Sequence, residues 1–254
     1  MLEDYFEKNK KLIINEIENS EFKHTAKVLF NFYMKSESIY SAISSIDFNA
    51  EFYPCIILLR CQIEHFLVAT YIWIQFRITN KDDVARTYNE EYLIYEMMKR
   101  INYAKNNNIP LSSRIAVVFQ KILDILTNKK ILKQRDLEKL NIKANQFDIR
   151  KISKFCDNNL PFEYDNIVKP TEIKTLLEYY NYYSSFVHGG PSADAMTSEE
   201  YKKTIVSEAG DFLKQNSILV GFQRLYILYF LSMKNEDIKK EFQREMDKLV
   251  ETSV

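Results

Sequence analysis

Glycine, proline and histidine are scarce in this chain of 254 residues, which contains 4 Gly, 5 Pro and 3 His. So few turn-forming residues disfavour β-sandwiches and doubly wound α/β folds, because glycine-rich turns recur in both. The adjacent pair Gly189 and Gly190 forms no phosphate-binding loop, and the chain has no GxSxG, HExxH or EF-hand motif. Three scattered histidines do not predict a metal centre. We therefore expect neither a metal ion nor an organic cofactor.

Net charge and long apolar runs are also missing. Lys plus Arg and Asp plus Glu both number 35, so bulk charge indicates neither a nucleic-acid nor a membrane partner. The longest apolar run, Phe66–Ile74, is less than half of the ~20 residues that span a bilayer. The N-terminal segment lacks the apolar core of a signal peptide. The cysteines form no CxxC pair, which predicts free thiols. Together these features predict a soluble, cytoplasmic protein.

Aromatic and apolar residues are abundant, with 17 Tyr, 17 Phe and 46% hydrophobic residues overall. They recur near the helical period, which predicts an all-α bundle of about nine or ten helices in a single domain, residues 1–254. Glu51–Thr79 and Asp211–Ser232 are apolar on almost every side, so we expect both to be buried and to pack together. The other predicted helices are Leu2–Ile17, Phe22–Ile46, Asp82–Lys105 with Asn80 as its cap, 112–126, Thr171–Val187, Ser198–Glu208 and Glu236–Glu251. Gln134–Leu140 and Ile149–Cys156 are short segments that are also compatible with a helix.

The segment Lys129–Lys154 is strongly basic, with nine basic residues against three acidic ones. Such an excess opposes burial, so residues 129–170 are predicted to form a basic insertion or side lobe of the bundle. The same cations can follow a nucleic-acid backbone, although a solvated helix face has the same pattern. The candidate nucleic-acid-binding residues are Lys129, Lys130, Lys133, Arg135 and Lys151.

Arg60 and Glu64 lie four residues apart inside the apolar helix Glu51–Thr79 and therefore share one face of it. Burying either charge alone is costly, so the two are predicted to pair. The pair either satisfies itself in the core or lines a polar pocket in which Arg60 holds a phosphate or carboxylate. His65 points about 140° away from Arg60 round the helix. It is therefore either a packed histidine or a candidate base.

Tyr180, Ser184 and His188 are spaced four residues apart and form one polar stripe at the end of the helix Thr171–Val187. The dipole at a helix C-terminus favours the imidazolium form of His188. An ordinary histidine at a helix cap has the same pattern. A Ser–His pair does not by itself indicate a serine hydrolase, which also needs an orienting acid and an oxyanion hole. We expect Arg60, Glu64 and His188 to lie within roughly 8 Å of one another, because buried polar groups need partners.

The stretches Leu58–Trp73 (R-x-x-x-E) and Tyr179–Pro191 (Y-x-x-x-S-x-x-x-H-G) resemble a family of all-helical bacterial proteins grouped loosely with HEPN domains. The resemblance implies a helical bundle, often a homodimer, from a toxin–antitoxin or phage-defence locus that also encodes a protein partner. Many HEPN proteins are metal-independent ribonucleases with an R-x(4–6)-H motif, which Arg60 and His65 satisfy. The catalytic residues that the resemblance implies are Arg60, Glu64, Ser184 and His188, with His65 as the alternative histidine.

Two kinds of function fit these residues. The first is a HEPN-like ribonuclease or effector of a phage-defence or toxin–antitoxin system. A histidine would then act as base or acid, and Arg60 would stabilise the phosphorane without a metal. The second is a non-catalytic helical partner or sensor whose polar pocket, including Tyr180, binds a nucleotide or another protein. RNA is the expected partner in the first case, and no membrane partner is expected in either.

Overall fold

The computed structural model of the chain describes residues 2–47, 52–92, 142–159, 170–187, 199–233 and 235–240, with isolated positions elsewhere. In these ranges the chain is helical apart from short turns and contains no strand, which confirms the predicted all-α bundle. The elements are α1 (Leu2–Glu18), α2 (Lys23–Ser44), α3 (Phe52–Thr79), α4 (Asp83–Arg86), the π-helix η1 (Thr87–Tyr92), the 3₁₀ helix η2 (Asn145–Phe147), α8 (Ile149–Asn159), α9 (Pro170–Val187) and α11 (Glu199–Ser232).

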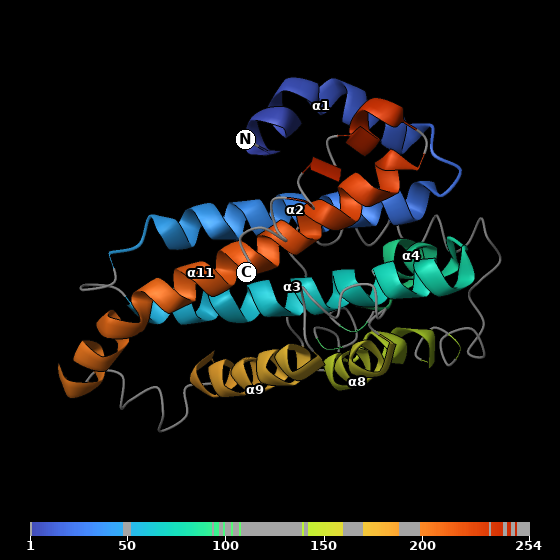
Figure 1. Cartoon of the computed structure of the whole chain (residues 1–254). Coiled ribbons are helices and arrows are strands. Elements are labelled where there is room, and N and C mark those ends of the chain that lie inside the picture. The colour runs from blue at the N-terminus through green and yellow to red at the C-terminus, as the bar shows by residue number, and fades with distance from the viewer. Residues whose placement is uncertain are drawn as a thin grey trace.

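Helix α3 is the central element of the bundle (Figure 1). α2 and α11 pack on one side of it, and α8 and α9 pack on the other. All residues from Phe66 to Ile74 are buried, with exposures between 0% and 7%. Such a run points in every direction around a helix, so this part of α3 contacts protein all round, as its apolar pattern predicts. α3 is also long and apolar enough to cross a membrane, yet 67% of its most apolar window is buried inside the bundle.

Buried hydroxyl groups join α11 to its two neighbours. The hydroxyls of Thr70 in α3 and Tyr226 in α11 lie 3.0 Å apart. Ser36 of α2 donates to Oε1 of Gln223 at 2.7 Å. Polar groups inside an apolar interface are satisfied only when their partners face them, so these contacts help to fix how α11 is aligned along α2 and α3.

Helix α11 runs unbroken from Glu199 to Ser232, so the prediction of two helices, Ser198–Glu208 and Asp211–Ser232, is wrong. The predicted break lies at Gly210, because glycine in a helix interior costs about 1 kcal/mol relative to alanine. The second half of α11 packs against both α2 and α3. Tertiary packing of this kind supplies most of the stability of a helix and outweighs a single glycine.

The turn after α3 also differs from the prediction, because Asn80 does not cap the following helix. Asn80 ends α3 in the left-handed conformation with a φ of 49°, and its N–H donates to the carbonyl of Phe76 at 2.7 Å. Asp82, two residues after Asn80, caps a different helix, α2. Its carboxylate accepts from the backbone N–H of His24 at 3.0 Å and of Thr25 at 2.7 Å. Backbone N–H groups at the N-terminus of α2 thus find their acceptor in an acid that lies 57 residues after Thr25 in the sequence.

The end of the predicted basic segment is part of the bundle. η2 and α8 bury Phe147, Ile152 and Cys156, and α8 packs against α3 and α9. Residues 129–138 and 160–169 lie outside the described residues, so the side lobe stays a prediction. The predicted helix 112–126 and, apart from Lys139, the predicted helix Gln134–Leu140 also lie outside them.

Alanine at Gly210 should stabilise the protein by about 0.5–1 kcal/mol, because it lowers the conformational entropy of the unfolded chain. Nothing lies within 4 Å of the position that its Cβ would occupy. Urea unfolding followed by circular dichroism measures the change. A free energy of unfolding that falls would contradict a continuous α11 at this position.

Removing the carboxylate of Asp82 should destabilise the protein by about 1–2 kcal/mol, as the loss of a helix cap does. The matched control is Asp83→Ala, since Asp83 pairs with Arg86 at an exposed site and such pairs contribute about 0–1 kcal/mol. Thermal or urea unfolding of both variants gives the comparison. Equal losses for Asp82→Ala and Asp83→Ala would show that Asp82 is not a cap.

Candidate functional site

Arg60 of α3 contacts the second half of α9 in a polar cluster between two apolar helices. Its Nε donates to Ser184 Oγ at 3.0 Å, and its Nη2 donates to the hydroxyl of Tyr180 at 2.8 Å. Nη1 lies 3.1 Å from Oε2 of Glu64, one turn later on α3. The guanidinium carbon is 4.7 Å from the centre of the Tyr180 ring, which is a cation–π distance. We call these four residues the Arg60 cluster.

The hydroxyl of Ser184 positions Arg60. It donates to the backbone carbonyl of Tyr180 at 2.7 Å while its oxygen accepts from Arg60. A serine nucleophile needs its proton directed at a base, whereas this proton is directed at the backbone. The geometry therefore does not support a serine hydrolase.

The guanidinium of Arg60 retains donors for a ligand. Arginine has five N–H groups, and its contacts with Glu64, Tyr180 and Ser184 use one on each nitrogen. Within the part of the chain that the structure describes, one N–H on Nη1 and one on Nη2 have no further partner. The side chain is 21% exposed. Donors on Nη1 and Nη2 match the oxygens of a phosphate or carboxylate, and Glu64 already places one carboxylate 3.1 Å from Nη1.

Glu64 lies close to α9 and also to the π-helix η1. Burial raises the pKa of Tyr180, and the charge of Glu64 raises it further. The pKa of Tyr88 is raised by burial first and then by Tyr92 and Glu64. Burial, followed by the charges of Glu96 and Glu64, raises the pKa of Tyr92 to about 12. These phenols keep their protons at neutral pH, so they can donate hydrogen bonds.

Tyr88 and Tyr92 are site neighbours that the sequence reasoning missed. Their rings stack with centroids 5.5 Å apart and an interplanar angle of 11°. Their four-residue spacing was the available signal, because it places both rings on one face of a helix. Short π-helices occur frequently at functional sites, and η1 places these two rings within electrostatic reach of Glu64.

His65 does not join the Arg60 cluster. Its ring packs edge-on against Phe32 of α2, with centroids 5.6 Å apart, whereas Arg60 contacts α9. Burial and, to a smaller extent, the charge of Lys35 lower the pKa of His65 to about 4. A group with so low a pKa is a weak base at neutral pH. The structure therefore places the R-x4-H residues against different helices and favours a packed His65.

His188 follows the last residue of α9 and lies outside the described residues. Its approach to Arg60 thus stays a prediction. Lys151 is exposed on α8, and its backbone N–H donates to Asp148 at the start of that helix. The other candidate nucleic-acid-binding residues also lie outside the described residues: Lys129, Lys130, Lys133 and Arg135.

The cysteines are free thiols. Cys55 and Cys156 are buried, and burial raises the pKa of both, that of Cys55 to about 12. A protonated thiol is not a nucleophile. No group of three His, Cys, Asp or Glu side chains that could hold a metal ion occurs in the described ranges.

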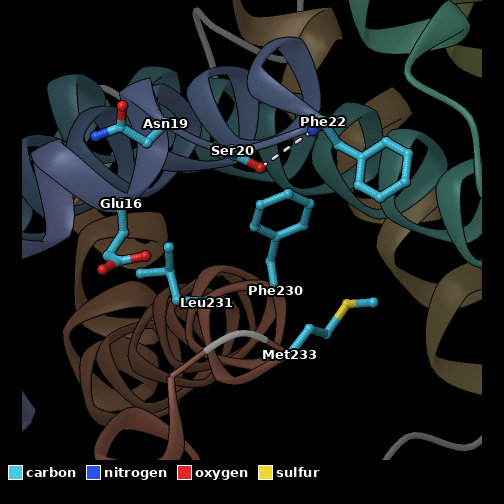
Figure 2. A pocket seen from close by; sticks show the side chains of 7 residues that line it. All are labelled: Glu16, Asn19, Ser20, Phe22, Phe230, Leu231 and Met233. Carbon is cyan, nitrogen blue, oxygen red and sulfur yellow. Dashed lines mark hydrogen bonds between the residues drawn. The ribbon is translucent and has the colours of Figure 1, made fainter.

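A small cavity lies between the end of α1 and the end of α11 (Figure 2). Ser20 stands at its edge, where its hydroxyl oxygen accepts from the N–H of Phe22 at 3.1 Å. The space of about 40 Å³ holds a few water molecules. None of the predicted site residues lines it; the lining residues are Glu16, Asn19, Ser20, Phe22, Phe230, Leu231 and Met233.

A family model matches residues 26–203, and its description is a family of unknown function, DUF5677. The matched residues include α3, α8 and α9 and therefore the whole Arg60 cluster. No curated protein and no solved structure matches the chain.

The lowered pKa of His65 predicts a pH-dependent stability. Between pH 6.5 and about 4 the unfolded chain binds a proton at His65 that the folded chain does not. The free energy of unfolding should therefore fall as the pH drops through this window, by up to about 1.4 kcal/mol per pH unit. His65→Gln removes this titration, so its stability should depend less on pH. Urea unfolding at several pH values tests this, and parallel curves for the two proteins would contradict it.

Proposed function

The chain belongs to the DUF5677 family, and we propose that it is a metal-independent ribonuclease whose site is the Arg60 cluster together with His188. The observation that supports this proposal is the contact between R-x-x-x-E of α3 and Y-x-x-x-S of α9, which leaves two N–H groups of Arg60 for an anion. His188 comes four residues after Ser184 in the sequence, so it is the histidine that we assign to the site.

RNA cleavage without a metal needs a base, an acid and a cation at the phosphorane. The base removes the proton of the 2′-hydroxyl, and the 2′-oxygen attacks phosphorus. The bond from phosphorus to the 5′-oxygen breaks, and that oxygen takes a proton from the acid. The products are a 2′,3′-cyclic phosphate and a 5′-hydroxyl. In our proposal, Arg60 binds two non-bridging oxygens, and Glu64 and His188 transfer the protons.

Tyr180 and Ser184 act as positioning residues in this proposal. Both hold the guanidinium from α9, so the orientation of its remaining N–H groups depends on them. A correctly oriented donor acts on charge that develops in the transition state without reorganising at that moment. Losing either contact should therefore reduce the turnover rate more than it weakens RNA binding.

The biological setting that we propose is a cytoplasmic effector of a phage-defence or toxin–antitoxin system, with a protein partner from the same locus. This part rests on the resemblance of the two motifs to HEPN proteins. Expression of the intact protein should arrest bacterial growth, and expression of an Arg60→Lys variant should not.

A second candidate function is a non-catalytic partner or sensor with a nucleotide-binding pocket. The observation in its favour is that Glu64, Tyr180 and Ser184 already engage Arg60 from within the chain. A sensor would bind nucleotides through the two remaining N–H groups and lose that binding in Arg60→Lys. It would not cleave RNA under any condition.

The variant Arg60→Lys should lower the rate of RNA cleavage by about 100-fold or more, because an ammonium cannot bind two phosphate oxygens as a planar fork. His188→Ala should lower it by about 10²–10⁴-fold, as the loss of a general acid or base does. RNA degradation in the presence of a chelator measures both, with thermal melting of the same samples.

Arg77→Lys is the matched control, since Arg77 is also an arginine of α3 held by a tyrosine hydroxyl and ring, those of Tyr229. It should leave cleavage unchanged. Equal losses in Arg60→Lys and Arg77→Lys would show that the effect is on folding. A His188→Ala variant that cleaves normally would remove this histidine from the site.

A further inference from the structure

The α8–α9 layer carries cations and aromatic rings on its solvent side. α8 and α9 pack against the same side of α3 and against each other (Figure 1). Their residues that point away from α3 therefore belong to one surface of the molecule. This surface is distinct from the Arg60 cluster, which lies where α9 faces α3.

The α8 part of this surface is basic. Arg150, Lys151 and Lys154 are exposed and lie within about one turn of each other. Asp157, within this helix, is paired with Lys174 of α9 at 3.4 Å, and Asp148, just before the helix, accepts from the backbone N–H of Arg150 and Lys151. Three cations against one carboxylate without a cationic partner among the described residues leave the outer side of α8 net positive.

The α9 part of this surface carries exposed aromatic rings together with the exposed carboxylate of Glu178. Tyr179 and Tyr182 are 39% and 48% exposed. Each ring rests on a buried one: Tyr179 stacks on Tyr183 with centroids 5.9 Å apart and 15° between planes, and Tyr182 meets Phe186 edge-on at 4.8 Å. Tyr53, 41% exposed, joins the same end of α9, because its hydroxyl donates to the carbonyl of Phe186 at 3.0 Å. Rings braced in this way lose little conformational entropy when a ligand binds.

We propose that this surface binds single-stranded RNA, with the α8 cations on the phosphates and with Tyr179 and Tyr182 stacked on bases. Proteins that bind single-stranded nucleic acids combine cations that contact the backbone with exposed aromatic rings on which bases stack, and the α8–α9 layer carries both. Double-stranded RNA keeps its bases stacked on one another and cannot offer their faces to a tyrosine. The inference deepens the proposed function by naming its substrate class, and it rests on that function.

RNA bound on this surface can extend to the Arg60 cluster, because the surface and the cluster lie on two flanks of the same helix, α9. Tyr179 and Tyr182 lie on the exposed part of the helix, while Tyr180 and Ser184 turn toward Arg60. A helix with its side chains is about 10–12 Å across. A strand held on Tyr182 therefore needs only a few further nucleotides to reach the guanidinium.

Fluorescence polarisation with a labelled 12-nucleotide 2′-O-methyl RNA tests the surface, because this probe cannot be cleaved through its 2′-oxygen. Tyr182→Ala should weaken binding by about tenfold, the effect of losing one stacked base. Tyr182→Phe should bind within about twofold of the unchanged protein, since the ring remains. The control is Ile218→Ala, which removes a similarly exposed apolar side chain from α11 and should bind normally.

The salt dependence of RNA binding tests the contacts between the α8 cations and the phosphates separately. Lys151→Ala should reduce the slope of log affinity against log salt by about 0.7, the value for one phosphate of a single strand. Tyr182→Ala should leave this slope unchanged. Lys240→Ala, an exposed lysine near the C-terminus, serves as the charge control. A duplex of the same sequence should bind at least about tenfold more weakly than the single strand.

The outcomes separate this inference from the proposed function. If single-stranded RNA binds through Tyr182 and Lys151 but natural RNA is not cleaved, the proposed binding surface is supported and the proposed ribonuclease activity is contradicted. Cleavage with unchanged affinity in Tyr182→Ala and Lys151→Ala would retain the ribonuclease and overturn the surface. Equal binding of duplex and single strand would overturn the stacking on Tyr179 and Tyr182. A change of molecular mass in Tyr182→Ala, measured by light scattering, would assign the rings to contact between two copies of the chain.

Discussion

The burial of α3 is the constraint on which the rest of this structure depends. The helix is surrounded by α2, α8, α9 and α11, so a polar side chain on it is costly to bury unless a partner faces it. Arg60 finds Tyr180 and Ser184 on α9, and Thr70 finds Tyr226 on α11. The partners of α3 thus align the other helices along it.

The same constraint explains why Arg60 is suited to bind a ligand. A fully buried guanidinium would need a partner for each of its five N–H groups. Arg60 is partly buried at the α3–α9 interface, with a side chain that is 21% exposed, and three contacts from its own chain fix its direction. Glu64 is 39% exposed, so the pair keeps access to water. Such a pair contributes about 1 kcal/mol or less to stability.

Much of the helical architecture could be predicted from the sequence, because apolar periodicity is a local signal. Helix α3 could be predicted because its segment is apolar on every side. The pairing of Arg60 with Glu64 could be predicted from their four-residue spacing. The prediction that polar groups on α3 and at the end of α9 meet concerns Arg60, Glu64 and His188. The structure shows Arg60 in contact with Tyr180 and Ser184, and the approach of His188 stays a prediction.

The features that could not be predicted depend on contacts distant in sequence. Asp82 caps α2 across 57 residues, and no local pattern marks such a partner. α11 continues through Gly210 because packing against α2 and α3 outweighs glycine's weak helix propensity. His65 satisfied a short R-x4-H pattern, yet its direction round α3 takes it to Phe32 and away from Arg60. A motif on one helix therefore has chemical meaning only once the neighbouring helices are known.

In the function that we propose, Arg60 stabilises the transition state of a metal-free attack by the 2′-hydroxyl of RNA. The most direct measurement uses an oligonucleotide with one ribonucleotide in a 2′-deoxy strand, incubated with the protein and a chelator, and identifies the product ends by mass spectrometry. We expect a single cut after the ribonucleotide, with a 2′,3′-cyclic phosphate on one product and a 5′-hydroxyl on the other. Cleavage at a deoxynucleotide, or activity that appears only when a divalent cation is added, would contradict it.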